Sequence, residues 1–421
     1  MIFIEKINSK DKINRTINMI KNPITRDFSL NILGSAIYTL STQILAYPFI
    51  SRIVSANEYG LILTLMGIAN AIGVAIGNPL NNTRILLQKN YSGKSNPGDF
   101  NLIFLLGLSI NIVLVSIISS LVIGGLDHNV VLVTFISILI LFRAYFTVSY
   151  RLVINYKKFL YSSLMGFLGY LIGVLIAKLT GTWGFVFIFG ELFTCAYIFV
   201  TSKYLVCEKP LRTNLFNLAA KKYTLIMSAA LISTMMTYMD RFFIYPFLGG
   251  AQVSIYNVAS FLGKTGGIIL TPIAGVLLTY YAKENNLTIH VFIKRLIAFF
   301  CFAVFLYIGI LIFGRPITTI LYPTLYKESM PYFMLANLAS TVFILGNTLQ
   351  PTLLRYCDSR WQPIIQIVYL LSYLILGVYG MDKFGLIGFC YSVLFSNVLK
   401  ILFMITVVIY SFSKSKEKGL L

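Results

Sequence analysis

The sequence predicts an all-α integral membrane protein with about twelve transmembrane helices. Of its 421 residues, 57% are hydrophobic and only 11% are charged. A soluble domain carries Asp, Glu, Lys or Arg at about a quarter of its positions, so this chain has too few charges to cover a surface exposed to water. Its apolar residues form continuous runs without a period of two, which excludes a transmembrane β-barrel.

Each predicted helix is a run of about twenty mostly apolar residues, the length that crosses the hydrocarbon core of a bilayer. In chain order the runs cover residues 29–50, 61–80, 101–124, 130–150, 160–178, 183–202, 223–244, 253–280, 296–313, 332–353, 363–380 and 384–410. A very short turn over residues 381–383 separates the last two runs.

The basic residues predict the topology, because cytoplasmic loops of membrane proteins carry an excess of Lys and Arg. Alternate loops and the two terminal arms hold 26 of the 34 basic residues, with Arg143 counted in one of these loops. The opposite loops hold five, and Arg241, Lys264 and Lys400 fall inside predicted helices. Both termini are therefore predicted to be cytoplasmic. Topology alone accounts for most of the net charge of +20, so we expect no nucleic-acid partner.

The longest basic loop predicts a division into two six-helix bundles. The expected parts are a basic N-terminal arm (1–28), an N-terminal bundle (29–202), a cytoplasmic linker (203–222), a C-terminal bundle (223–410) and a cytoplasmic tail (411–421). A weak internal repeat supports the division, since Ser35 and Ser41 match Ser228 and Thr234 at one constant shift. Equal halves in the same orientation predict a parallel pseudo-two-fold repeat with a substrate path between the halves.

Asp240 and Arg241 stand at the end of an apolar run just past the middle of the chain. Charged side chains within transmembrane segments are unfavourable, and they usually mark substrate or ion pathways. We therefore predict a functional role for both residues. The alternative is that the pair lies at the water interface and only ends a helix.

Lys264 lies about a dozen residues from either end of the next predicted helix. Asn257, Ser260 and Lys264 share one face of that otherwise apolar helix. A central Lys is unfavourable by roughly 2.5–3.5 kcal/mol on insertion scales unless it meets water or an anion. The pattern predicts that Lys264 lines a wet cavity and contacts a phosphate. The alternative is a structural pair with Asp240.

Two further charged residues are candidates in the N-terminal half. Arg84 follows Asn78 closely at the end of the second run, where it either contacts substrate or anchors the helix in the cytoplasmic headgroups. Glu191 and Asp240 are the acidic residues that lie well inside predicted spans, so both are candidates for ion coupling. For Glu191 the alternative is a hydrogen bond to a neighbouring helix.

Other chemistry is not indicated by the sequence. The five cysteines and two histidines are scattered, and no phosphate-binding loop of the Walker type is present, so neither a metal site nor a cofactor is predicted. No nucleophile and base occur together in a recognisable motif. The longest loop expected on the far side, residues 314–331, is too short for a membrane polymerase or ligase of glycan synthesis.

Two stretches resemble the polysaccharide transporter family of the multidrug/oligosaccharidyl-lipid/polysaccharide exporter superfamily. One covers residues 50–60, with Arg52 and the sequence Glu58-Tyr59-Gly60. The other runs from Asp240-Arg241 through Leu248-Gly249 to Tyr256-Asn257-Val258-Ala259, and it has Ile255 where the family often has glycine. The helix number and the two halves agree with this family over the whole chain.

The resemblance implies two bundles arranged as a V around a central cationic cavity. It implies flipping of an undecaprenyl-pyrophosphate-linked oligosaccharide, such as an O-antigen repeat unit, between the leaflets of a bacterial inner membrane. A polysaccharide polymerase and a chain-length regulator are the expected protein partners, beside the lipid bilayer. The cavity would use Lys264, Arg84, Arg241, Asn257, Ser260 and Asn78. The alternative function within the superfamily is a drug or metabolite cation antiporter.

Overall fold

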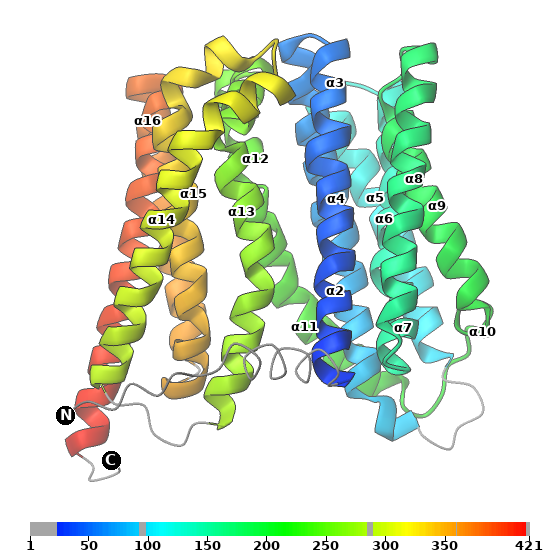
Figure 1. Cartoon of the computed structure of the whole chain (residues 1–421). Coiled ribbons are helices and arrows are strands. Elements are labelled where there is room, and N and C mark those ends of the chain that lie inside the picture. The colour runs from blue at the N-terminus through cyan, green and yellow to red at the C-terminus, as the bar shows by residue number, and fades with distance from the viewer. Residues whose placement is uncertain (1–22, 92–97, 284–288, 359, 418–421) are drawn as a thin grey trace, which may run out of the picture. The chain divides into compact units, whose positions relative to one another are not determined.

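The computed structural model describes residues 23–91, 98–283, 289–358 and 360–417, and every regular element among them is helical (Figure 1). Of the basic arm predicted over residues 1–28, residues 1–22 lie outside these ranges and residues 23–28 are helical. The helices of the first half are α2 (Pro23–Leu40), η1 (Ser41–Ala46), α3 (Tyr47–Ile53), α4 (Ala56–Leu86), η2 (Gln88–Tyr91), α5 (Asp99–Ile123), α6 (His128–Phe146), α7 (Val148–Leu152), α8 (Tyr156–Thr180), α9 (Gly184–Thr201) and α10 (Lys203–Val206). Those of the second half are α11 (Phe216–Thr237), α12 (Met239–Leu248), α13 (Gly250–Lys283), α14 (Ile289–Leu321), α15 (Tyr326–Tyr356) and α16 (Trp361–Glu417).

Eight helical stretches within the described ranges are long and apolar enough to cross a membrane. The last of them is 52 residues long, Trp361–Phe412, which is enough for two crossings. Large apolar side chains stay exposed along α5, α8, α14 and α16. Apolar surface of this extent has lipid as its natural solvent. The all-α membrane class is therefore confirmed, whereas twelve crossings remain a prediction.

Two predicted connections are wrong in detail. Residues 314–331 are mostly helical, because α14 continues to Leu321 and α15 begins at Tyr326. The turn predicted at residues 381–383 is helical too, and the chain reverses at Gly385, with φ 61° and ψ −142°. This left-handed φ suits glycine, which lacks the Cβ atom that would clash there.

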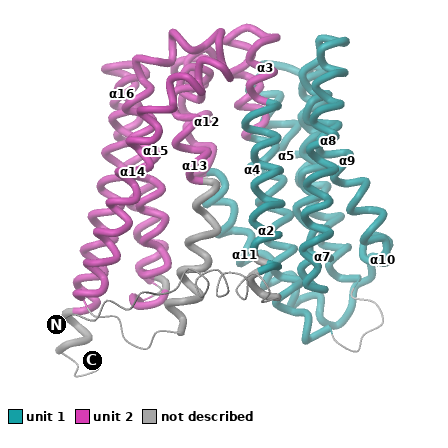
Figure 2. The backbone as a smooth tube through the Cα atoms, in the orientation of Figure 1, with its two compact units in different colours: residues 1–46, 68–235 teal, residues 47–67, 236–421 magenta. Residues whose placement is uncertain are grey.

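The helices group into two compact units (Figure 2). Unit 1 contains residues 1–46 and 68–235, and unit 2 contains residues 47–67 and 236–421. The grouping differs from the predicted bundles in two places, because residues 47–67 belong to unit 2 and most of α11 belongs to unit 1. The sequence places these segments by chain order, whereas the grouping follows their packing.

Glycines allow the closest helix packing within unit 1. On α8, a Cβ atom added to Gly169 would lie 2.3 Å from the carbonyl oxygen of Phe189, and one added to Gly173 would lie 2.7 Å from that of Phe185. Small residues let two helix backbones approach this closely, which is how membrane helices gain packing energy without a hydrophobic driving force. The α8–α9 pair is thereby fixed, and it carries one of the charged clusters described below.

A buried polar network holds the predicted linker against unit 1. The side chain of Asn101 donates to the carbonyl oxygens of Leu205 (3.0 Å) and Glu208 (2.9 Å). The carboxylate of Asp99 accepts from the backbone N–H of Thr213 (2.6 Å) and from the phenol of Tyr91 (2.7 Å). Burial raises the pKa of Tyr91, so its phenol stays protonated and can donate. Residues 205–213 are thus bound to unit 1.

Candidate functional site

Asp240 and Lys264 form an ion pair inside unit 2. The ammonium nitrogen of Lys264 on α13 lies 2.5 Å from Oδ2 of Asp240 on α12. The Asp240 side chain is 8% exposed and the Lys264 side chain is 33% exposed. The ammonium also lies 4.7 Å from the ring centroid of Tyr256, within cation–π range. The structural pairing considered for Lys264 therefore exists, and a third of the surface of its side chain is exposed.

Asn337 of α15 fixes α13 directly before Lys264. Its side-chain amide donates to the carbonyl oxygen of Ala259 (2.6 Å) and accepts from the N–H of Gly263 (2.8 Å). These two backbone groups bond to each other in an undisturbed helix, and a side chain inserted into that ladder is a recognised cause of local bending. Since Gly263 directly precedes Lys264, the hydrogen bonds of Asn337 fix the backbone from which the Lys264 side chain extends.

Arg241 forms its hydrogen bonds with groups other than its neighbour Asp240. Its guanidinium donates to the carbonyl oxygen of Leu63 on α4 (2.9 Å) and to the side chain of Asn257 on α13 (3.3 Å). The rings of Tyr47 and Tyr238 lie 5.7 and 5.4 Å from its central carbon. Asp240 and Arg241 are both buried, so this pair does not simply end a helix in bulk water.

Ser260 and Arg52 of unit 2 bond to the protein itself. Ser260 is buried, and its hydroxyl donates to the carbonyl oxygen of Tyr256 (2.8 Å) on its own helix. Arg52 donates to the carbonyl oxygens of Ile320 (2.5 Å) and Leu321 (3.4 Å) at the end of α14. A cation at that position stabilises the negative end of a helix.

Arg84 lies in unit 1, in a buried ion pair. Its guanidinium contacts the carboxylate of Glu208 at 2.8 Å and donates to the phenol of Tyr145 at 2.8 Å. Asn78, one and a half turns earlier on α4, is exposed. The substrate contact and the membrane anchor proposed for Arg84 both require a free guanidinium. In the structure the guanidinium is instead paired with Glu208 of the linker.

Glu191 on α9 is at the centre of a four-helix cluster in unit 1. Its carboxylate accepts from Nε of Arg143 on α6 at 2.7 Å and from the phenol of Tyr38 on α2. The phenol of Tyr170 on α8 lies 3.4 Å away. Arg143 also donates to the oxygen of Tyr38 (2.8 Å) and lies over its ring. The hydrogen bond to a neighbouring helix expected as the alternative for Glu191 is present, together with an ion pair.

Sequence reasoning missed Arg143 and the two tyrosines. Counting Arg143 among the loop cations is wrong, because it lies in α6 and its side chain is only 19% exposed. A signal was present, since a carboxylate deep in a span needs a cation and Arg143 falls within the run 130–150. Tyr38 lies three residues before the π-helical segment η1, a feature common at functional sites but invisible in the hydropathy pattern.

Lys400 was assigned no role from the sequence, although it was placed inside a span. It is buried on α16, about 22 Å along the helix from Gly385. Its ammonium lies 3.3 Å from the side-chain oxygen of Asn347 and between the rings of Phe343 (4.9 Å) and Tyr369 (4.7 Å). Among the contacts of the described residues, none joins Lys400 to a carboxylate.

The buried charges of the two units are balanced differently. In unit 1, Arg84 pairs with Glu208 and Arg143 pairs with Glu191. In the described part of unit 2, Asp240 is the one buried carboxylate, and the same part contains two buried cations, Arg241 and Lys400, beside its half-buried partner Lys264. The embedded part of unit 2 therefore carries an excess of positive charge, which suits an anionic ligand.

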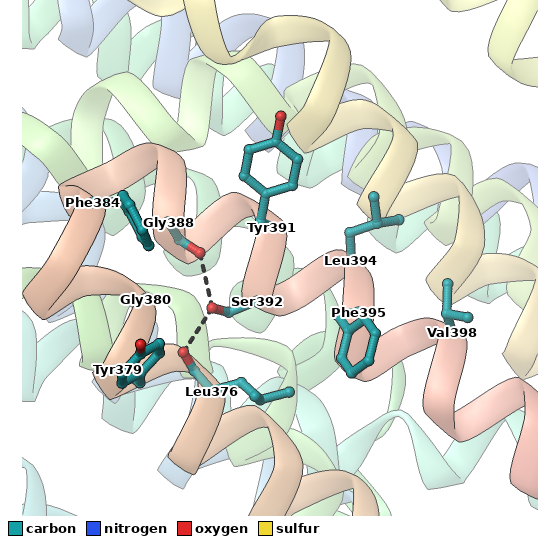
Figure 3. Close-up of a pocket in the computed structure, with 10 residues that line it drawn as sticks. All are labelled: Leu376, Tyr379, Gly380, Phe384, Gly388, Tyr391, Ser392, Leu394, Phe395 and Val398. Atoms are coloured by element: carbon teal, nitrogen blue, oxygen red, sulfur yellow. Dashed lines mark hydrogen bonds between the residues drawn. The ribbon is translucent and has the colours of Figure 1, made fainter.

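A separate pocket of about 480 Å³ lies between the two arms of α16, which are the helical parts before and after Gly385 (Figure 3). Aromatic and aliphatic side chains line it, and Ser392 donates to the carbonyl oxygen of Leu376 on the other arm (2.6 Å) and to that of Gly388, one turn earlier on its own arm (2.8 Å). It contains no charged group. The pocket can accommodate hydrocarbon, but it offers nothing to hold a phosphate.

Comparison with known proteins places the fold. A solved structure described as the lipid II flippase MurJ in an inward closed conformation matches with a TM-score of 0.70 at 17% identity, covering 93% of this chain and 90% of that chain. One described as an outward-facing multidrug resistance MATE family transporter of the MOP superfamily gives 0.64 at 13% identity, covering 95% and 97%. No protein-family model and no curated protein sequence matches the chain.

The chain therefore has the fold that MurJ and MATE structures share. These structural neighbours are transporters, not enzymes. At identities of this size the likeness shows the fold alone.

Proposed function

We propose that the protein is a flippase that moves an undecaprenyl-pyrophosphate-linked oligosaccharide from the cytoplasmic to the periplasmic leaflet of a bacterial inner membrane. The O-antigen repeat unit is the representative cargo. The observation that carries the proposal is the excess of embedded positive charge in unit 2, with Lys264 partly exposed beside its carboxylate partner. The likeness to a lipid II flippase supports the same class of cargo.

The chemistry of the cargo explains why such a site is needed. A pyrophosphate and a sugar cannot cross hydrocarbon unaided, because removing water from ionised groups is strongly unfavourable. An ammonium held in a protein cavity replaces part of that hydration, while the lipid tail stays in the bilayer. Alternating access then exposes the headgroup to each side in turn, and no covalent bond is made or broken.

Among the predicted ligands, Lys264 is the one we propose as the principal phosphate contact. Arg241 and Asn257 are buried and bond to each other, so their proposed part is a fixed positive potential behind Lys264. Arg84, Ser260 and Asn78 remain cargo candidates only if the protein rearranges, since the first two already have protein partners. A polysaccharide polymerase and a chain-length regulator are the proposed partners, and both termini are proposed to be cytoplasmic.

A drug or metabolite cation antiporter is the second candidate, and the likeness to MATE transporters favours it. Such a pump needs a free carboxylate to hold a cation. Asp240 is already neutralised by Lys264, and Glu191 by Arg143. The arrangement of charges therefore favours the anionic cargo.

Complementation of a bacterial strain that lacks its flippase tests the proposal. The wild-type gene should restore surface polysaccharide, Lys264→Ala should restore little or none, and Lys264→Arg should restore part. Lys383→Ala removes an exposed lysine of the same unit and serves as the matched control. If the wild-type protein, present in the membrane, restores no polysaccharide and instead confers drug resistance, the antiporter is the correct function.

A further inference from the structure

Four buried hydrogen-bond donors in unit 2 lack a partner of good hydrogen-bond geometry in the part of the chain that the structure describes. They are Nε of Arg241 on α12, the phenols of Tyr59 on α4 and of Tyr322 after α14, and the hydroxyl of Thr318 on α14. Tyr59, Tyr322 and Thr318 are fully buried, and Arg241 is 6% exposed. Buried polar groups almost always have a partner, so a group of unpaired donors indicates something bound between them.

These donors belong to one neighbourhood. The rings of Tyr59 and Tyr322 lie 6.5 Å apart, and the N–H of Tyr322 bonds to the carbonyl oxygen of Thr318 (2.8 Å), one helical turn earlier. The Arg241 guanidinium donates to the carbonyl oxygen of Leu63, one helical turn after Tyr59 on α4. A small rotation lets one phenol donate to the other, which still leaves one phenol O–H, the Nε–H and the threonine hydroxyl without an acceptor.

The backbone around the donors is held in place. A Cβ atom on Gly60, next to Tyr59, would lie 1.8 Å from the carbonyl oxygen of Gly250, so α4 and α13 touch there through glycines. Arg52 binds the last carbonyl oxygens of α14, and Thr324 donates to the carbonyl oxygen of Ser51 (3.1 Å). Contacts from both sides therefore position Tyr59 and Tyr322 before any ligand binds.

We propose that these donors form a binding site for a small monovalent anion of the halide class, separate from the cargo site at Lys264. The four groups all donate, and a guanidinium contributes a positive charge that no carboxylate contacts directly among the described residues. Ordered water would accept hydrogen bonds from the donors but would leave the charge of the guanidinium uncompensated. A halide accepts the same hydrogen bonds and also neutralises that charge.

Thermal unfolding of the purified full-length protein tests the site. Tm is measured in sodium chloride, sodium bromide and sodium gluconate at one ionic strength. We expect a saturable rise of Tm with either halide, because a ligand that binds only the folded state stabilises it. The double variant Tyr59→Phe/Tyr322→Phe should weaken halide affinity about tenfold or more, the usual size of losing a hydrogen bond to a charged group.

The control is Tyr379→Phe, the same substitution at an exposed tyrosine of unit 2. It should leave halide affinity unchanged. Thr318→Val provides a milder variant if the double variant fails to fold. The Tm difference between each variant and the wild type should be smaller in gluconate, where the site is empty in all of them, than in halide, whereas a merely structural hydroxyl would lower Tm equally in every salt.

Anomalous scattering from crystals grown in bromide gives direct evidence, with a peak expected between Tyr322 and Arg241. Equal wild-type Tm values in all three salts and no bromide peak would mean that ordered water fills the site, and the proposal would be wrong. The outcome is independent of the cargo, because Lys264→Ala should abolish complementation and keep the halide response.

Discussion

The ammonium of Lys264 lies 2.5 Å from the carboxylate of Asp240, and this contact joins α13 to α12 within unit 2. One of the embedded cations is thereby compensated, and Arg241 and Lys400 are left without a carboxylate of their own among the described contacts. In unit 1 the guanidinium of Arg143 lies 2.7 Å from Glu191, and that pair is complete. An anion is therefore expected to bind more favourably in unit 2 than in unit 1.

A double substitution separates the two roles of Lys264. Asp240→Asn alone should lower stability by about 1–3 kcal/mol, less than for a fully buried pair because a third of the Lys264 side chain is exposed. Asp240→Asn/Lys264→Gln removes both charges and should recover most of that stability. It should still fail to complement, because the phosphate contact is gone. Tm and surface polysaccharide are the two measurements, and full complementation by the double variant would show that Lys264 only holds Asp240.

The cluster at Glu191 should behave as a structural unit. Arg143→Met should lower stability by about 3–5 kcal/mol, because it leaves a buried carboxylate without its cation. Arg143→Met/Glu191→Met should recover most of that loss, since an apolar pair of similar volume avoids desolvating charges. The Tm of the purified single and double variants measures both effects.

The double variant also tests ion coupling through Glu191. A protein that is stable yet no longer moves cargo would assign Glu191 to coupling, because the fold no longer needs it. Normal translocation would restrict Glu191 to packing and leave Asp240 as the coupling candidate. The exposed pair Asp382 and Lys383 offers a control in which double replacement should change neither Tm nor translocation.

The helices could be predicted from the sequence because each one is a continuous run of apolar residues. Runs of apolar residues indicated the long helices, although α14 begins seven residues before its predicted run and ends eight residues after it. The deep charges at Asp240, Lys264 and Glu191 stood out against that background. Their partners could not be found in this way. Whether Lys264 meets Asp240 or a cargo phosphate depends on how α12 and α13 pack, and hydropathy carries no information about that.

The same limit applies to the linker. Its basic composition predicts a cytoplasmic connection, but the ion pair of Glu208 with Arg84 spans more than a hundred residues of sequence. Nothing local signals that Asn101 binds the carbonyl oxygens of Leu205 and Glu208. Long-range polar contacts of this kind become visible only once the helices are placed.

Release of the linker is a third prediction. Glu208→Gln removes the charge that holds Arg84, and limited proteolysis should then cut residues 203–215 several-fold faster. Lys209→Gln changes the neighbouring charge without touching the pair and is the control. Equal cleavage rates in Glu208→Gln and the control would show that Asn101 and Asp99 hold the linker without the ion pair.

Lys400 gives the last prediction, in which stability and activity should change in opposite directions. A lysine near the centre of a span is unfavourable by roughly 2.5–3.5 kcal/mol. Cation–π contacts with the rings of Phe343 and Tyr369 offset about 1–2 kcal/mol of that amount. Lys400→Met removes the charge and keeps a side chain that packs well on aromatic rings, so it should raise Tm. Complementation should fall, because unit 2 loses part of its excess positive charge. Lys383→Met, at an exposed site, should alter neither property. A marked drop in Tm for Lys400→Met would instead show that Lys400 stabilises the packing of α15 against α16. Lys264 would then be the single residue that supports the proposal of an anionic cargo.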